Sequence, residues 1–378
     1  MSIALVDYSH LIHRSLHSLV AVNPPEKGPD GKFLTCTYIE KVKSRILMIL
    51  QKINQTHEEL VLCIDARPNW RAELDSTYKG HRAAGRAESL INFDEVFSSL
   101  DDFLVKLESF PLSIIDVPLA EADDIGGVLA KYFTDNKTYA NMITSDHDWA
   151  QSITDYVQQY DPIKKKFNEL SETELNYTYI ECLDEDVLNF SLVHAIQGDK
   201  GDGVSTLTGG TQFTEVFQSH LDGFKHGITP FMFSNFTQEQ KERLTRDFTS
   251  LKLLTSGKNK GKVKQPEELD LYKSVPLSGA LQVKKLMTTI NDVLRANEHY
   301  KKNFLMNYKK VSFTQIPSEI IENVIQAFEN RVKTFDKKIM NETIALLPGS
   351  NKHVFSNISS PRYVNISQKD NTFDFSGF

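Results

Sequence analysis

Short apolar runs alternate with longer amphipathic stretches along the N-terminal part of the chain. Runs bounded by polar or turn-forming residues are typical of buried strands, and here they cover residues 2–9, 58–68, 112–118, 139–146 and 155–161. Between them, residues 37–55 and 93–110 place apolar side chains at helical spacing. Strands that alternate with helices predict an α/β fold, in which helices flank a central, mostly parallel sheet.

Helical patterns dominate from about residue 185 onward, at residues 184–198, 212–224, 278–300 and 318–335. A lysine-rich insert at 255–266 interrupts them, and the end of the chain is rich in Ser and Asn. We therefore expect three parts: an α/β core over 1–184, a helical region over 185–345 and a flexible tail over 346–378.

Composition and charge narrow the protein class. Of the 378 residues, 40% are hydrophobic and 25% charged, as in soluble globular proteins. The apolar start is too short for a signal peptide, and no run is long enough to cross a membrane. Three cysteines without paired spacing fit a reducing cytoplasm. The net charge of −7 does not exclude a nucleic-acid partner, because basic residues cluster at 41–45, 78–86, 164–166 and 257–264.

Acidic residues stand where the predicted strands end and where one helix begins. Asp7, Asp65 and Asp146 each close a predicted strand, so they should meet at one edge of a parallel sheet. A further set lies at a helix start, in the TSDHD segment and in the GDKGDG segment; it comprises Glu121, Asp123, Asp124, Asp148, Asp199 and Asp202. Each acid taken singly is more often a helix cap or a solvated turn residue.

Caps do not explain why so many strands end on Asp, nor why the acids come in pairs. If the nine acids converge, their repulsion requires counter-cations. Oxygen ligands without His or Cys favour Mg²⁺, with Mn²⁺ able to replace it, and the number of acids favours two ions. Gly126 and Gly127 would then leave room for backbone or substrate behind the ligands. This pattern indicates a phosphodiester hydrolase.

Five motifs carry a resemblance to a known family. They are LVDYSH, VLCIDARPNWR, EADD, TSDHD and GDKGD, in this order, together with a Tyr-Lys-x-x-Arg stretch at 78–89. The chain resembles the 5′-nuclease (flap endonuclease) superfamily, most closely its T-even phage ribonuclease H type. The resemblance covers residues 3–205 densely and returns near 300–330. It implies a PIN-like core, a helical arch over about 69–100 and a helical C-terminal region.

The resemblance also assigns roles to individual residues. It implies a first metal site that consists of Asp7, Asp65, Glu121, Asp123 and Asp146. It implies a second site made by Asp148, Asp199 and Asp202, with Asp124 supporting either site. Lys79 and Arg82 would contact the scissile phosphate, and Tyr78, Arg86 and Lys200 would contact DNA. A degenerate helix–hairpin–helix over 199–217 would touch the duplex, and whether it binds K⁺ stays open.

The resemblance implies a Mg²⁺-dependent 5′-to-3′ exonuclease that is also a 5′-flap endonuclease. Its substrates would be duplex DNA with a flap or nick and RNA–DNA hybrids. Its task would be the removal of RNA primers during replication. No polymerase follows, so we expect a monomer that acts alone. Residues 368–378 place three Phe at the terminus, which suits docking to a single-strand-binding protein or sliding clamp. Two alternatives stay open: a non-catalytic DNA-binding relative and a PIN-like RNase. A phosphate-binding loop and an aspartyl-phosphate motif are both absent from the sequence.

Overall fold

The computed structural model describes residues 2–199, 201–207, 290–331 and 336–348. The chain divides into two compact units. The first consists of the residues up to Glu169 and those from Phe313 on, and the second is Leu170–Ser312. The domain boundaries expected at residues 184 and 345 stay a prediction.

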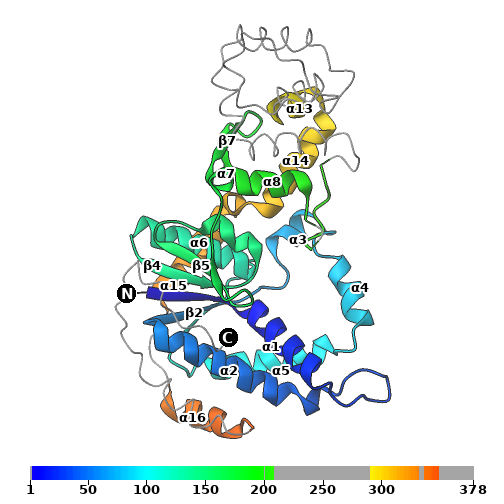
Figure 1. Ribbon diagram of the computed structural model, residues 1–378, viewed down its shortest axis with the longest axis vertical. Coiled ribbons are helices and arrows are strands. Elements are labelled where there is room, and N and C mark those ends of the chain that lie inside the picture. The colour runs from blue at the N-terminus through cyan, green and yellow to red at the C-terminus, as the bar shows by residue number, and fades with distance from the viewer. Residues whose placement is uncertain (1, 200, 208–289, 332–335, 349–378) are drawn as a thin grey trace, which may run out of the picture. The chain divides into compact units, whose positions relative to one another are not determined.

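A six-stranded sheet forms the centre of the first unit (Figure 1). Its strand order is β3-β2-β1-β4-β5-β6, and every pair is parallel except the last. The strands are β1 (Ser2–Asp7), β2 (Glu59–Cys63), β3 (Ser113–Ile115), β4 (Tyr139–Ile143), β5 (Val157–Asp161) and β6 (Lys166–Asn168). The predicted mostly parallel sheet is confirmed, and the short antiparallel strand β6 was not foreseen.

Helices cover both faces of this sheet. On one face lie α1 (Tyr8–Val22), α2 (Ile39–Thr56), α5 (Phe93–Leu107) and α16 (Lys337–Leu346). On the other face lie α6 (Ala122–Asp135) and α15 (Ser318–Glu329). Ala4 and Val6 of β1 face the first layer, whereas Ile3 and Leu5 face the second. Strands buried on both sides need continuous apolar runs, which is why these strands could be predicted from the sequence.

The segment predicted as a helical arch contains α3 (Trp70–Leu74), α4 (His81–Glu88) and the start of α5. Helix α4 is mostly exposed, so it buries little of its own surface, and it connects α3 to the helical layer beside α5 (Figure 1). Single-turn 3₁₀ helices occur at Thr35–Thr37 and Phe313–Gln315, and a longer one at His147–Ser152.

In its described residues, the second unit is helical apart from one hairpin. Its helices are α7 (Glu172–Leu175), α8 (Asn189–Gln197), α13 (Ile290–Ala296) and α14 (Glu298–Val311), and its hairpin is β7 (Tyr177–Ile180) with β8 (Glu185–Leu188). Helix α14 packs on α8, where the Asn307 side chain donates to the carbonyls of Ala195 and Ser205 at 2.9 and 2.8 Å.

Two predictions for this unit need correction. The helix expected from residue 184 begins only at Asn189, because residues 185–188 pair with β7 as a strand. The helix expected over 278–300 is described from Ile290 on and is broken at Asn297, whose side chain caps α14 by accepting from the amides of His299 and Tyr300. The predicted helix at 212–224, the insert at 255–266 and the tail from residue 349 on lie outside the described residues. In the part of the chain that the structure describes, no helix is long and apolar enough to span a membrane.

Candidate metal centre

The carboxyl edge of the central strands carries the acids that the sequence predicted to meet. Asp7 is the last residue of β1, and β1 pairs in parallel with β4. Asp146 follows β4 by three residues rather than ending it, because the strand stops at Ile143 and a turn follows. Likewise β2 stops at Cys63, which places Asp65 in the loop beyond it. These two acids therefore lie on loops just beyond the strand ends.

Asp7, Asp123 and Asp146 form an acidic cluster. Each offers one carboxylate oxygen, and these atoms all lie within 4.8 Å of one another. Asp7 is 5% exposed, Asp123 is half-buried and Asp146 is exposed, so the cluster opens toward solvent on one side. Within the described ranges, no other group of three acidic, His or Cys side chains approaches this closely.

The electrostatics of the acidic cluster are unfavourable without a cation. Burial and the charges of Asp65 and Asp146 raise the pKa of Asp7 from 3.8 to about 7. Burial and the charges of Asp146 and Asp7 raise the pKa of Asp123 well above its ordinary value, although the charge of Lys79 opposes this. A hard divalent cation removes this repulsion and accepts oxygen ligands. The donor set therefore fits a Mg²⁺-type ion.

Neighbouring polar groups hold the three carboxylates in place. Asp7 caps α1 by accepting from the His10 amide at 2.8 Å, and the Thr144 hydroxyl donates to its other oxygen at 3.0 Å. The Asp146 amide donates to the same Thr144 hydroxyl at 3.0 Å, which ties both acids to one side chain. Sequence reasoning missed Thr144, although it lies within the TSDHD motif.

Asp123 is held by Trp149, whose indole N–H donates to the Asp123 carboxylate at 2.5 Å. The buried Trp149 ring lies against Gly126, where an added Cβ would clash with it, and the Phe313 ring lies against Gly127 in the same way. The room left by the two glycines is thus filled by aromatic side chains of the fold. The expectation that backbone or substrate occupies it was wrong.

Asp65 and Asp148 lie beside the acidic cluster. The half-buried Asp65 accepts the Ala122 amide of the first turn of α6 at 2.8 Å, and its charge contributes to the raised pKa of Asp7. The Asp148 amide donates to the Asp146 carboxylate at 3.0 Å, which places Asp148 in the first turn of the 3₁₀ helix that Asp146 caps. Both stay predicted ligands.

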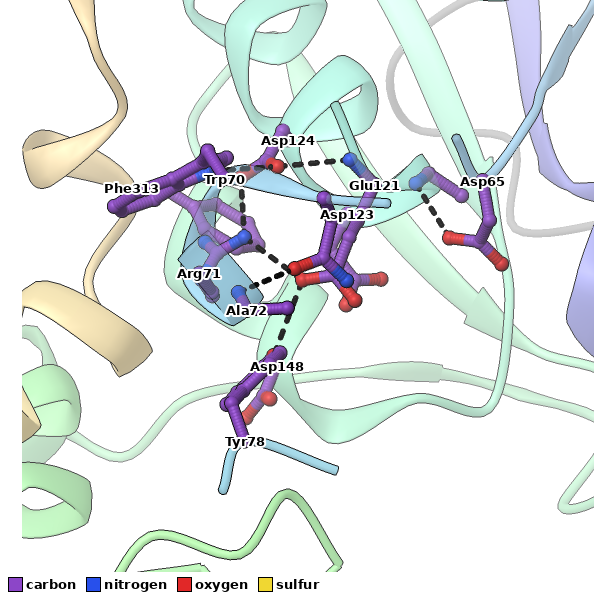
Figure 2. Close-up of polar contacts among 12 residues, drawn as sticks. Asp65, Trp70, Arg71, Ala72, Tyr78, Glu121, Asp123, Asp124, Asp148 and Phe313 are labelled. Carbon is purple, nitrogen blue, oxygen red and sulfur yellow. Dashed lines mark hydrogen bonds and ion pairs between the residues drawn. The ribbon is translucent and has the colours of Figure 1, made fainter. Parts of the chain in front are cut away.

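Glu121 and Asp124 turn instead toward a buried cation, Arg71 of α3 (Figure 2). Arg71 Nη1 lies 3.0 Å from Glu121 Oε2 and 2.7 Å from Asp124 Oδ1. The Trp70 indole N–H and the Glu121 amide donate to the other oxygen of Asp124, each at 2.9 Å. Burial raises the pKa of Asp124, and the Arg71 charge opposes that shift. Trp70 and Arg71 lie at the end of the VLCIDARPNWR motif, but nothing in the sequence indicated their partners.

The basic residues predicted to contact the substrate follow α3 in the chain and continue into α4. Lys79 Nζ lies 2.8 Å from Glu121 Oε1, and the buried Tyr78 hydroxyl donates to Glu121 Oε2 at 3.1 Å. Arg82 is exposed on α4. Arg86 is half-buried over the Phe97 ring, and burial together with nearby arginine charges lowers its pKa.

The remaining predicted ligands belong to the second unit and are described within it alone. Asp199 and Asp202 are half-buried residues of a tight turn, in which the Asp199 carboxylate accepts from the Gly201 amide at 2.5 Å. Lys200 lies outside the described residues, as does most of the predicted helix–hairpin–helix at 199–217.

The sequence of this chain is similar to known proteins over part of its length. Residues 2–180 match the family model of the 5′-3′ exonuclease N-terminal resolvase-like domain. Ribonuclease H of Enterobacteria phage T4 is 28% identical over 156 residues, which are 40% of this chain and 47% of that protein. A 5′-3′ exonuclease of Streptomyces coelicolor is 29% identical over 195 residues, 48% of this chain and 60% of that protein.

A third relative, the flap endonuclease of Escherichia phage T5, is 28% identical over 178 residues, 46% of this chain and 57% of that protein. The chain thus spans about half the length of the curated relatives it matches. The family match covers every strand of the central sheet and all three acids of the cluster. Residues 2–180 of this chain are therefore similar in sequence to the 5′-3′ exonuclease N-terminal resolvase-like domain.

Proposed function

We propose that the protein is a Mg²⁺-dependent 5′-to-3′ exonuclease and 5′-flap endonuclease. Its substrates would be duplex DNA with a flap or nick and RNA–DNA hybrids, and its task would be RNA primer removal in replication. The observation that carries this proposal is the acidic cluster of Asp7, Asp123 and Asp146 at the strand edge of a nuclease-family core. Such a cluster is costly to a fold that makes no use of it.

Asp7, Asp123 and Asp146 would hold the first ion, with Asp65 and Glu121 as the further predicted ligands. A second ion would be held by Asp148, Asp199 and Asp202. Bound divalent cations would supply Lewis-acid activation of water and charge stabilisation at the scissile phosphate.

The chain's own contribution is to bind and orient the substrate. Lys79 would donate to the scissile phosphate and Arg82 to the same group from the start of α4, where fixed positive charge stabilises the negative charge that develops during hydrolysis. Tyr78, Arg86 and Lys200 would contact DNA. The exposed cations of α4 support a contact with DNA here, because proteins bind backbone phosphates mainly through such cations.

The proposal also covers the oligomeric state of the protein, its location and its partners. The protein would act as a monomer in the cytoplasm, the host's if a phage encodes it. Residues 368–378 would dock to a single-strand-binding protein or a sliding clamp.

The proposal is tested by incubating 5′-labelled flap, nicked-duplex and RNA–DNA substrates with Mg²⁺, with Mn²⁺ and with EDTA. Wild-type protein should cleave all three with either ion and none in EDTA. Asp146→Asn should lower kcat at least ~1,000-fold, because the amide is a poor ligand for a hard cation. Asp135→Asn changes an exposed acid at the far end of α6 and serves as the control with unchanged cleavage.

Three results would count against the proposal. Cleavage in EDTA would remove the metal from the mechanism. Tight binding of flap DNA without cleavage would favour a non-catalytic relative, and cleavage of single-stranded RNA alone would favour a PIN-like RNase.

A further inference from the structure

A buried arginine joins the start of α6 to the segment that leads into α4. Arg71 is 2% exposed, and its Nη1 lies within ion-pair distance of both Glu121 and Asp124 (Figure 2). Its guanidinium also stacks over the Trp70 ring at 4.5 Å, and Trp70 in turn donates to Asp124. A buried charge is stable only with partners of opposite sign, so these side chains depend on one another.

Glu121 extends this ion pairing outward to Lys79. One Glu121 oxygen accepts from Arg71 and from the Tyr78 hydroxyl, and the other accepts from Lys79 Nζ at 2.8 Å. The exposed fraction rises along the series, from 5% for the Glu121 side chain to 19% for the Lys79 side chain. The result is a continuous chain of alternating charge that runs Asp124–Arg71–Glu121–Lys79 and ends near the surface.

The backbone at Lys79 shows that the end of this chain is held in place. Lys79 has a φ of 54°, in the left-handed region that residues other than Gly seldom adopt. Such a conformation persists where surrounding contacts determine it. The contacts at Lys79 include the ion pair with Glu121, the position of its Nζ over the Tyr78 ring at 5.0 Å from the centroid, and the Arg82 amide that donates to its carbonyl. Lys79 is thereby kept close enough to Asp123 for its charge to affect that carboxyl.

Stability is a weak reason for such a chain. A buried ion pair is often no more stabilising than well-packed apolar residues of the same volume. What the four charges achieve is a defined position for the cation at the exposed end. We propose that Arg71 is a positioning residue, which fixes Lys79 beside the acidic cluster by orienting Glu121. This rests on the proposed function, in which Lys79 contacts the scissile phosphate.

The first test measures Mg²⁺-dependent cleavage of a 5′-flap substrate by Arg71→Met, Lys79→Ala and the double variant. A cation displaced by about 1 Å can cost on the order of 100-fold, so Arg71→Met should lower kcat by about that factor and change KM less than about threefold. In the Lys79→Ala background the same substitution should change kcat less than about twofold, because the residue it positions is gone. Arg71→Lys, which keeps the charge, should recover part of the loss. Equal losses in both backgrounds would overturn the proposal.

The second test needs no activity. In metal-free protein, an amine-acylating reagent and mass spectrometry give the labelling rate of each lysine. Lys79 should label more slowly than Lys131, whose side chain is 77% exposed. Arg71→Met should raise the Lys79 rate several-fold and leave the Lys131 rate unchanged, because Glu121 is no longer oriented to pair with Lys79.

Tyr78→Phe provides a milder variant in case Arg71→Met does not fold. It removes only the hydroxyl that donates to Glu121, so it should raise Lys79 labelling in the same direction by a smaller factor. An unchanged Lys79 rate in every folded variant would overturn the proposal. If wild-type protein showed no nuclease activity, the proposed function would fail while the labelling result still decided the role of Arg71.

Discussion

Asp123 and Asp124 are adjacent residues of the same type in the first turn of α6, and the structure gives them opposite surroundings. Asp123 faces two further carboxylates, those of Asp7 and Asp146. Asp124 is fully buried and faces Arg71 and Trp70. Successive helical residues point about 100° apart, so neighbours cannot share one environment. The difference shows that adjacent acids at a helix start can have opposite surroundings, one facing other carboxylates and the other paired with a buried cation.

The most direct test of this difference between Asp123 and Asp124 is to make the same substitution at both positions. Asp123→Asn should lower kcat at least ~1,000-fold and leave the free energy of unfolding unchanged or higher, because it removes a repelled charge. Asp124→Asn should lower the free energy of unfolding by about 3 kcal/mol, because Arg71 loses one of its buried partners. Urea denaturation in EDTA and flap cleavage at a temperature where both variants are folded provide the two readouts.

The opposite result is equally informative. An Asp124→Asn variant of normal stability that had lost its activity would make Asp124 a metal ligand. It would also merge the two environments that the structure separates.

The next effect on stability is expected from pH, through Asp7. The unfolded chain releases the Asp7 proton near pH 3.8, whereas the folded, metal-free protein keeps it up to about pH 7. The folded state therefore binds the extra proton between these values, and the free energy of unfolding falls as pH rises from about 4 to 7, by about 4 kcal/mol at most from this group. Asp7→Asn still caps α1 but cannot ionise, so the fall due to Asp7 should disappear.

The measurement is the difference between the unfolding free energies of wild type and Asp7→Asn at each pH in EDTA. The difference should widen with pH up to about 7, and saturating Mg²⁺ should reverse its sign, because the ion binds the ionised carboxylate. Parallel curves for the two proteins would mean that the acidic cluster does not strain the fold.

The smallest predicted effect concerns the support behind Asp123. Gly126→Ala puts a methyl group into the Trp149 ring and should cost about 1–3 kcal/mol of unfolding free energy. Gly85→Ala is the matched control, because its added Cβ on α4 meets nothing within 4 Å and should gain up to about 1 kcal/mol from helix propensity. Thermal melts of both variants test this. Equal shifts would mean that Trp149 yields easily and does not hold Asp123 rigidly.

Much of the sheet and its acidic edge was predictable, because both depend on local pattern. Parallel strands such as β1 and β4 are buried on both faces, so their apolar runs are continuous, and Asp7 and Asp146 follow from where those runs stop. Strands β2 and β4 end two and three residues before Asp65 and Asp146, because loop residues separate each strand from its acid.

The separate roles of neighbouring acids were not predictable, because they depend on a contact between distant residues. Arg71 lies 50 positions before Glu121, and its burial follows from how α3 packs, which no local pattern records. The hairpin of β7 and β8 was missed for a related reason. Its turn uses Asp184 at a φ of 57° instead of a glycine, so the acids after it resemble a helix start.

The Arg71 network also bears on the order of events when the protein is made. Four carboxylates crowd this edge of the sheet: Asp7, Glu121, Asp123 and Asp124. Cations of the same chain, Arg71 and Lys79, neutralise two of them, Glu121 and Asp124. A newly synthesised chain can therefore bring these elements together before any ion arrives. If the acidic cluster binds an ion as proposed, folding and metal binding would be successive steps, and loss of the ion would leave a folded site that can bind it again.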